Sequence, residues 1–445
     1  MSISSKKAAL ITLGCKVNQY ESEAIAEKLA EYGITIADAG EICDVYIINT
    51  CTVTAESERK CRQMIRRALK TNPNAYILVC GCLSQTDPES IKAIGGVDYI
   101  CGNTNKLSVA DIALELIRKG QKSTTVSENI GDVFSCPFES MSIKHFDRTR
   151  AYVKIQDGCE SRCTYCIIPS ARGHIRSKAF DDVLDEIKTL TEGGCREVVL
   201  TGIETGSYGK ETGKYDLSDL LMAIDGIEGI NRVRTGSLDP AIMKRGFIDR
   251  LARVRSLSPH FHLSMQSGSN RILALMKRRY NAEMALEAIE YLREKIDDVM
   301  FTTDVITGFP GESDEDFEKT KEFLRKARFL AVHVFPYSER ENTPAAKMPN
   351  KVPVGLRHER CNELIEYQKQ ISYSVIDDYI NTHDSVSVLF ETYEDGLAIG
   401  HTPSFVEVAV RSDVPLHSRI FDVRPIERRG TLCFGEIIKE RNSEL

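Results

Sequence analysis

Three closely spaced cysteines, Cys159, Cys163 and Cys166, are the residues whose chemistry is easiest to infer from this chain. They lie in the segment GCESRCTYCIIPSARG and have the spacing CxxxCxxC. Three thiolates at this spacing can wrap a 4Fe-4S cube while binding only three of its irons. The fourth iron is then open to a small molecule, so the spacing predicts a reactive cluster rather than a structural one.

A structural zinc site is the main alternative, because zinc also binds closely spaced thiolates. Such a site needs a fourth protein ligand, commonly from a second CxxC or an HxxxH pair. No such pair follows Cys166 in the sequence. The spacing therefore favours a cluster of the kind that cleaves S-adenosylmethionine into a radical.

A second set of cysteines follows strand-like segments near the N-terminus. Cys15 follows ITLG, Cys51 follows IINT and Cys82 follows VCG, about one βα repeat apart. Because carboxyl ends of parallel strands meet at one sheet edge, these thiolates could form a second cluster site with an open iron. Cys80 competes with Cys82, and spacing leaves that choice open. The other cysteines are predicted to be small buried side chains: Cys43, Cys61, Cys101, Cys136, Cys195, Cys361 and Cys433.

Composition describes a soluble globular chain of 445 residues, with 42% hydrophobic and 28% charged residues. This length predicts two or three domains, and no apolar run reaches the roughly 18 residues of a membrane span. We expect a cytoplasmic protein, whose 14 cysteines serve metal binding or catalysis rather than disulfides. The net charge of −7 argues against a surface that coats nucleic acid, although it permits local basic patches.

The order of strand-like and helix-like segments predicts an α/β chain of several parts. KAALITLG, DVYIINT and AYILVCG alternate with helical patterns, which predicts a doubly wound α/β domain over 1–120. A linker over 121–148 follows. Six further strand candidates predict an incomplete (β/α)6 barrel over 149–360: AYVKIQ, REVVLTG, RVRTGS, HFHLSM, VMFTTDVITG and FLAVHVFPY. A connecting helix over 361–381 and a small all-β barrel over 382–445 complete the expected fold.

Several longer motifs carry a resemblance to a known family: TLGCKVNQYES, NTCTVT, GCLSQ, RAYVKIQDGCESRCTYCIIPSARG, HLSMQSGS, TTDVITGFPGE and AIGHTPSFVEV. Together they resemble the radical S-adenosylmethionine methylthiotransferases over nearly the whole chain. TLGCKVNQYES, NTCTVT and YVKIQDGC most resemble the branch that acts on N6-threonylcarbamoyladenosine beside the tRNA anticodon. The resemblance implies a cluster-binding N-terminal domain, a radical domain and a C-terminal TRAM barrel that binds RNA.

The resemblance also implies cofactors and partners. It places an auxiliary 4Fe-4S cluster on Cys15, Cys51 and Cys82, which favours Cys82 over Cys80, and the radical cluster on the CxxxCxxC loop. One S-adenosylmethionine methylates a sulfur at the auxiliary cluster, and a second supplies the radical that activates carbon 2 of the adenine. No catalytic residue beyond the cluster ligands is expected. The expected partners are the tRNA anticodon stem-loop and a reductant such as flavodoxin or ferredoxin, and the expected state is a monomer without membrane association.

Strand ends of the barrel supply candidate contacts to S-adenosylmethionine. Gly202 and Glu204 follow the second strand and would lie beside the methionine moiety, and Gln266 and Ser267 end the fourth strand near the ribose. Asp304 lies on the fifth strand. Each polar side chain here has the alternative of a structural hydrogen-bonding role.

Basic residues in three places are candidate RNA contacts. Arg59, Arg62 and Arg66 recur at helical spacing. Further candidates follow the radical motif or lie in the C-terminal barrel: Arg172, Arg176 and Arg428. A solvated charged face is the alternative for any one group, but three groups together favour phosphate contact with single-stranded loop RNA.

Two other functions compete with methylthiolation of threonylcarbamoyladenosine. A non-catalytic RNA-binding protein with structural zinc predicts no iron and no acid-labile sulfide. Radical chemistry on another target, isopentenyladenosine in tRNA or an aspartate of a ribosomal protein, retains both clusters. The wording of the motifs disfavours both of those targets.

Overall fold

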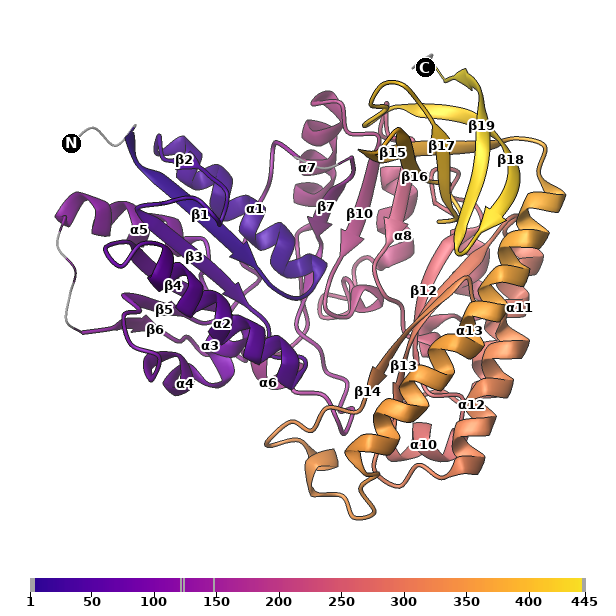
Figure 1. Ribbon diagram of the computed structural model, residues 1–445, viewed down its shortest axis with the longest axis horizontal. Coiled ribbons are helices and arrows are strands. Elements are labelled where there is room, and N and C mark those ends of the chain that lie inside the picture. The colour runs from indigo at the N-terminus through magenta and orange to yellow at the C-terminus, as the bar shows by residue number, and fades with distance from the viewer. Residues whose placement is uncertain (1–4, 121, 123–124, 147–148, 442–445) are drawn as a thin grey trace.

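The computed structural model describes residues 5–120, 122, 125–146 and 149–441, and the remainder of the predicted linker and both chain ends lie outside these ranges. An N-terminal sheet, a central set of strands and a small C-terminal barrel follow one another along the chain (Figure 1). Within the described residues, no helix has the length and apolar character needed to cross a membrane.

The N-terminal part is a parallel sheet covered by helices on both faces. In the described residues its strands lie in the order β2 (Thr35–Ile36), β1 (Lys7–Thr12), β3 (Val45–Thr50), β4 (Tyr76–Gly81), β5 (Tyr99–Cys101) and β6 (Ser127–Asn129). Its helices are α1 (Lys16–Glu31), α2 (Ala55–Thr71), α3 (Cys82–Thr86), α4 (Pro88–Lys92) and α5 (Ser108–Lys119). Helices α1 and α5 pack on one face and α2, α3 and α4 on the other, which confirms the doubly wound fold.

The apolar pattern predicted the central strands of this sheet but not its edge. All residues of β3 and β4 are buried, as continuous apolar runs in parallel sheets require. Strand β6 falls inside the segment that was predicted to be an irregular linker, and it pairs in parallel with β5. Its three residues are exposed and polar, so they carry no apolar signal for a strand.

The central part is an open barrel built from all six predicted strands. They are β7 (Ala151–Lys154), β10 (Glu197–Thr201), β11 (Arg232–Thr235), β12 (His260–Gln266), β13 (Met300–Thr307) and β14 (Ala331–Pro336). Two three-stranded parallel sheets, β7-β10-β11 and β12-β13-β14, are joined by the isolated bridges Val233–Leu257 and Leu238–Leu263. Within the described ranges β7 and β14 are not paired, so the barrel is incomplete, as predicted.

Helices and short elements connect these strands on the outside of the barrel. The helices are α6 (Ile168–Arg172), α7 (Phe180–Glu192), α8 (Leu217–Ile224), α9 (Arg245–Leu251), α10 (Asn270–Leu275), α11 (Ala282–Lys295) and α12 (Asp314–Ala327). The short elements are β8 (Gln156–Asp157), β9 (Arg176–Ser177), η2 (Thr205–Ser207), η3 (Pro240–Ile242) and η4 (Pro344–Lys347).

A long helix leads from the open barrel to a small closed one. Helix α13 (Val354–Thr382) is longer than the predicted connecting helix over 361–381, because its helical pattern begins directly after Pro353. The closed barrel has the order β15-β16-β17-β19-β18. Its strands are β15 (Val386–Glu394), β16 (Leu397–His401), β17 (Glu407–Arg411), β18 (Ile420–Arg429) and β19 (Leu432–Glu440).

The closed barrel packs against the amino ends of the central strands. Glu197, at the start of β10, binds Arg234 Nε at 2.6 Å and lies 3.5 Å from Arg232. Arg234 also donates to the carbonyl of Pro403 at 2.8 Å. Burial by itself raises the pKa of Glu197, but the arginines hold it down at about 2. One carboxylate therefore offsets part of the positive charge of the arginines that join the two barrels.

We expect Glu197→Gln to destabilise the protein by about 3–5 kcal/mol, because it leaves buried arginines without their counter-ion. A carboxyl whose folded pKa is depressed gives stability above its unfolded pKa of about 4.3, and this is lost as pH falls toward 2. Urea unfolding at pH 7 measures the loss. Asp185→Asn removes an exposed pair with Lys188 and should cost less than about 0.5 kcal/mol. Equal effects of both substitutions would refute the role of Glu197.

Candidate active site

The CxxxCxxC loop lies at the carboxyl end of the first barrel strand, between β8 and α6. Gly158 opens the loop with φ +76°, and a Cβ there would lie 1.8 Å from the carbonyl oxygen of His174. Only glycine fits this approach. The amide of Cys159 then donates to the carbonyl of Gly173 at 3.0 Å, which fixes the base of the loop.

A buried arginine contacts the second cysteine of this loop. Arg278 Nη1 donates to Cys163 Sγ at 3.1 Å, and Nη2 donates to Asp239 Oδ2 at 2.9 Å. Arg278 lies beyond α10 in the sequence MKRRY, where nothing marks it as functional, and sequence reasoning missed it. A guanidinium at this position stabilises the thiolate form that binds metal.

Two thiols of this loop, Cys159 and Cys166, hold their protons more tightly than a free cysteine. Burial raises the pKa of Cys166 to about 11, and burial followed by the neighbouring Glu204 carboxylate raises that of Cys159. Ligand thiols must lose their protons to bind iron, so loading this loop releases protons. Three thiols on one loop are the donor set of a 4Fe-4S cluster bound through three thiolates. Among the described residues, no three such side chains converge closely enough to hold a metal ion as they stand.

Glu204 has the free polar atom that a bound cosubstrate requires. Its Oε1 accepts from Ser161 Oγ at 3.4 Å, whereas its Oε2 is buried and has no partner within the described residues. The amide of Glu204 donates to Gln156 Oε1 at 2.8 Å, which ties this strand end to the cysteine loop. A buried, unpaired carboxylate oxygen fits the amino group of S-adenosylmethionine.

The other predicted cofactor contacts differ in their placement. Gly202 follows β10 and is closely packed, because a Cβ at this position would lie 2.8 Å from Gln156 Oε1. Gln266 ends β12 with φ +66° and is half-buried. Asp304 lies on β13, where its Oδ2 is 3.2 Å from His262 Nε2. These three residues remain available to a cofactor.

Ser267 is a correction to the predicted cofactor set. Its side chain is 1% exposed, and its hydroxyl accepts from the amide of Ser269 at 3.1 Å. It also lies 3.4 Å from the hydroxyl of Thr320. These contacts indicate a structural role in the turn before α10, because the hydroxyl has no surface left for a ribose.

The second cysteine triplet lies at the carboxyl ends of β1, β3 and β4. Cys15 precedes α1, Cys51 follows β3 and Cys82 begins α3. Burial, together with the nearby thiols of Cys82 and Cys15, raises the pKa of Cys51 to about 11. A Cβ on Gly14 would lie 2.9 Å from Cys51 Sγ, so the first two loops are closely packed. The three thiols therefore share one edge of the sheet, as expected.

The local backbone separates Cys82 from Cys80. The strand ends at Gly81, which has φ +102°, and Cys82 is already in a helix. Cys80 is fully buried against the α1 and α5 face. Alternation along the strand ends at this glycine, so the strand pattern does not fix the direction of the Cys82 side chain.

Lys16, the first residue of α1, is exposed but lies near charged residues of the open barrel. Surrounding protein atoms and the guanidinium groups of Arg150 and Arg234 lower its pKa, whereas Asp304 acts in the opposite direction. These three partners belong to the central part of the chain, so the first residue of α1 faces that barrel. Sequence reasoning did not single out Lys16.

Arg172 joins the two triplets, and its position corrects its predicted contact with RNA. It is fully buried, and its Nε donates to Cys82 Sγ at 3.4 Å. Its Nη1 binds Glu21 Oε1 at 2.6 Å. Arg176 is also buried and donates to the carbonyl of Arg172 at 2.7 Å. Neither guanidinium reaches the surface that an RNA phosphate would touch.

The remaining arginines predicted to bind RNA are accessible. On α2, Arg59 and Arg66 are exposed, and Arg62 is partly exposed and lies 3.9 Å from Glu58. Arg428 pairs with Asp377 at 2.8 Å. Helix α2 follows the Cys51 loop directly, so its basic residues lie next to the second triplet.

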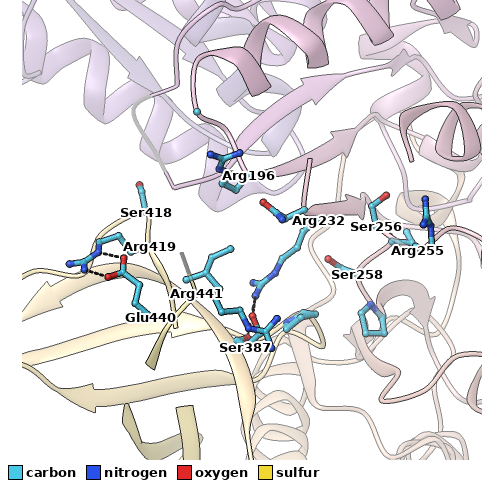
Figure 2. Close-up of a pocket in the computed structure, with 16 residues that line it drawn as sticks. Arg196, Arg232, Arg255, Ser256, Ser258, Ser387, Ser418, Arg419, Glu440 and Arg441 are labelled. Carbon is cyan, nitrogen blue, oxygen red and sulfur yellow. Dashed lines mark hydrogen bonds and ion pairs between the residues drawn. The ribbon is translucent and has the colours of Figure 1, made fainter. Parts of the chain in front are cut away.

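A polar cavity of about 660 Å³ lies between the two barrels, away from both triplets. Figure 2 shows arginines from both barrels around it, and Arg419 pairs with Glu440. The lining residues Arg232 and Pro259 stand at the amino ends of β11 and β12. The cysteine loops follow the opposite ends of their strands, so this cavity is separate from the candidate active site.

Comparisons with known proteins agree with this arrangement. Residues 153–324 match the Radical SAM superfamily, and residues 7–102 match Uncharacterized protein family UPF0004. The first match covers the CxxxCxxC loop and the open barrel from β7 into α12, without β14. The second covers β1 to β5 of the sheet that carries the other triplet.

Relatives match along nearly the whole chain. The threonylcarbamoyladenosine tRNA methylthiotransferase MtaB of Bacillus subtilis is 36% identical over 98% of this chain and 97% of that protein. The tRNA-2-methylthio-N(6)-dimethylallyladenosine synthase of Aquifex aeolicus is 34% identical over 98% of this chain and 99% of that protein.

Among solved structures, the radical S-adenosylmethionine methyltransferase TsrM of Kitasatospora setae has a TM-score of 0.55 and 15% identity, with 77% of each chain covered. At this identity the likeness concerns the fold alone.

Proposed function

The chain belongs to the radical S-adenosylmethionine methylthiotransferase family, and on this premise we propose that it methylthiolates carbon 2 of N6-threonylcarbamoyladenosine in tRNA. One observation carries the proposal: a buried arginine on the segment after the CxxxCxxC loop donates to a cysteine of the second triplet. This contact supports the proposal that the two candidate metal sites belong to one site. Transfer of a sulfur group by a radical reaction requires both metal sites to lie within one enclosed space.

The proposed cofactors are two 4Fe-4S clusters and S-adenosylmethionine. The cluster that generates the radical would be held by Cys159, Cys163 and Cys166. The auxiliary cluster would be held by the second triplet: Cys15, Cys51 and Cys82. When bound, these groups supply reductive cleavage of one S-adenosylmethionine and a sulfur that a second one methylates. The protein binds and orients them, and the unpaired oxygen of Glu204 supports a cosubstrate amine.

Contacts between the domains would keep water out of this space. Arg340, in the loop after β14, forms an ion pair with Glu58 and donates to Thr52 Oγ1 at 3.1 Å. Ser338 Oγ accepts from the amide of Ala55 at 3.1 Å. These contacts hold the Cys51 loop against the open barrel, and Arg172 holds Cys82 against it. Both contacts support sulfur transfer within an enclosed site.

Two surfaces would position the RNA. The arginines of α2 lie next to the auxiliary triplet, where they could bind phosphates of the anticodon loop. The C-terminal closed barrel, which we propose is a TRAM module, would contact the stem. The cytoplasmic location, the monomeric state and the flavodoxin- or ferredoxin-type reductant remain predictions.

Nucleoside analysis of tRNA from cells that lack the protein tests the proposal. We expect the 2-methylthio nucleoside to disappear while its threonylcarbamoyladenosine precursor accumulates. Accumulation of dimethylallyladenosine would instead assign the chain to the other tRNA branch. Unchanged tRNA would overturn both assignments.

We expect Arg59→Glu to weaken tRNA binding and to reduce the slope of log affinity against log salt by about one, because one phosphate contact is lost. Filter binding across a salt series measures both quantities. Arg325→Glu is the matched control, since Arg59 and Arg325 each form an i,i+3 pair with a glutamate on an exposed helix face. Equal weakening by the two variants would mean that net charge, not the α2 surface, governs affinity.

A further inference from the structure

Arg172 lies where the N-terminal sheet and the open barrel meet, and its partners come from both. From α1, Asn18 Oδ1 accepts from Nη2 at 2.6 Å, and Glu21 accepts from Nη1. From the barrel, Asp157 Oδ2 lies 3.2 Å from Nη1. The Nε–H donates to Cys82 Sγ, so the guanidinium is shared between carboxylates and a thiol.

The buried ion pairs around Arg172 contain more positive than negative charge. Within the described residues they join two carboxylates to four cations: Glu21 and Asp157 with Lys106, Lys154, Arg172 and Arg176. Glu139, which accepts from the amides of Lys106 and Leu107, adds a third carboxylate and leaves the cations in excess. Buried charge without a counter-charge is costly, and three thiolates beside the guanidinium would supply one.

Removing Arg172 would leave each carboxylate with other partners. Glu21 keeps Lys106 and Lys154, and Asp157 keeps Lys154 and Arg176. The cation is therefore not needed to neutralise these two acids. What would be lost is the hydrogen bond to Asn18 Oδ1 and the contact with Cys82. The second of these indicates a role toward the metal site.

We propose that Arg172 is a positioning residue of the auxiliary cluster site, which holds and stabilises the Cys82 thiolate across the domain boundary. The inference rests on the proposed auxiliary cluster. Because residues 159–172 carry both the radical cysteines and this arginine, one continuous segment serves both metal sites. Arg278 has the corresponding contact with Cys163 in the radical loop. Hydrogen bonds to cluster sulfurs raise the reduction potential, so each arginine would tune its own cluster.

Two parent variants allow each metal site to be measured without the other. The triple Ala variant of Cys159, Cys163 and Cys166 retains only the auxiliary triplet, and the triple Ala variant of Cys15, Cys51 and Cys82 retains only the radical loop. Arg172→Gln and Arg278→Gln are placed in each full-length parent. Iron and sulfide contents after anaerobic reconstitution report cluster retention, and a redox titration followed by electron paramagnetic resonance reports the potential.

In the auxiliary-only parent, we expect Arg172→Gln to weaken cluster retention by about 10–100-fold and to lower the potential. Arg278→Gln should leave that cluster unchanged and affect the radical-only parent instead. Arg172→Lys keeps the positive charge but not the planar guanidinium fork, so it should restore retention in part.

The outcomes distinguish this inference from the proposed function. An auxiliary-only parent that binds no iron would overturn the auxiliary cluster and this inference together. A parent that binds iron equally well and at the same potential with Arg172→Gln would overturn the inference alone. Circular dichroism of the apoprotein shows whether Arg172→Gln folds. If it does not, Arg172→Lys decides the question, and an unchanged potential in that variant refutes the role.

Discussion

Replacing Cys163 with alanine is expected to abolish reductive cleavage of S-adenosylmethionine, a loss of at least about 10³-fold in rate. The substitution removes one of three cluster ligands and leaves the buried guanidinium of Arg278 against a methyl group. The two remaining thiols would not hold a cluster at the end of β7, and the reductive chemistry that the cluster would supply would be lost. Chromatographic detection of 5′-deoxyadenosine in the presence of dithionite measures the effect.

A matched cysteine shows whether this loss is specific. Cys195 is also buried in the barrel, where its Sγ donates to the carbonyl of Glu197 at 3.2 Å, at the opposite end of the strands. Cys195→Ala should cost about 1 kcal/mol of stability and leave cleavage within about twofold of the parent. Continued 5′-deoxyadenosine formation by the Cys163 variant would refute the radical-cluster assignment.

Replacing Cys51 with alanine should separate the two halves of the reaction. We expect S-adenosylmethionine cleavage to continue, because the CxxxCxxC loop is intact. Formation of methylthiolated tRNA should fall at least about 10³-fold, because the auxiliary cluster loses a ligand and its sulfur has no site. Mass spectrometry of digested tRNA and assay of 5′-deoxyadenosine measure the two products in one sample.

The same strand offers the control for this variant. Cys43 precedes β3 and Cys51 follows it, and both are buried. Cys43→Ala should retain methylthiolation, since that thiol lies at the amino end of the sheet. Methylthiolated tRNA from the Cys51 variant would show that the sulfur site lies elsewhere.

Regular spacing made the main elements predictable. The strands β3 and β4 are largely apolar, and the six barrel strands alternate with amphipathic helices, so the local pattern predicted both parts. The edge strand β6 could not be predicted from its own residues, which are polar and exposed. It is a strand because it pairs with β5, and that pairing depends on the folded sheet. The extent of α13 depended on Pro353, which precedes its first turn.

Within the site, burial decided roles that residue type could not. Basic residues after the radical motif predicted RNA contacts, yet Arg172 and Arg176 are buried in ion pairs with Asp157. The sequence does not specify whether a charged side chain faces solvent or pairs with a carboxylate from another domain. The polar Ser267 likewise became part of a turn.

By itself, the sequence determined the inventory of thiols and their order along the strands. Cluster ligands lie close in sequence or at strand ends, and both are local properties. Only the tertiary structure decided that Arg278 faces Cys163 and that Arg172, which follows the radical loop in sequence, contacts Cys82 of the second triplet. These contacts join residues far apart in the chain: 151 positions separate Arg172 from Glu21. Their geometry depends on how the sheet and the open barrel pack together, which no local pattern specifies.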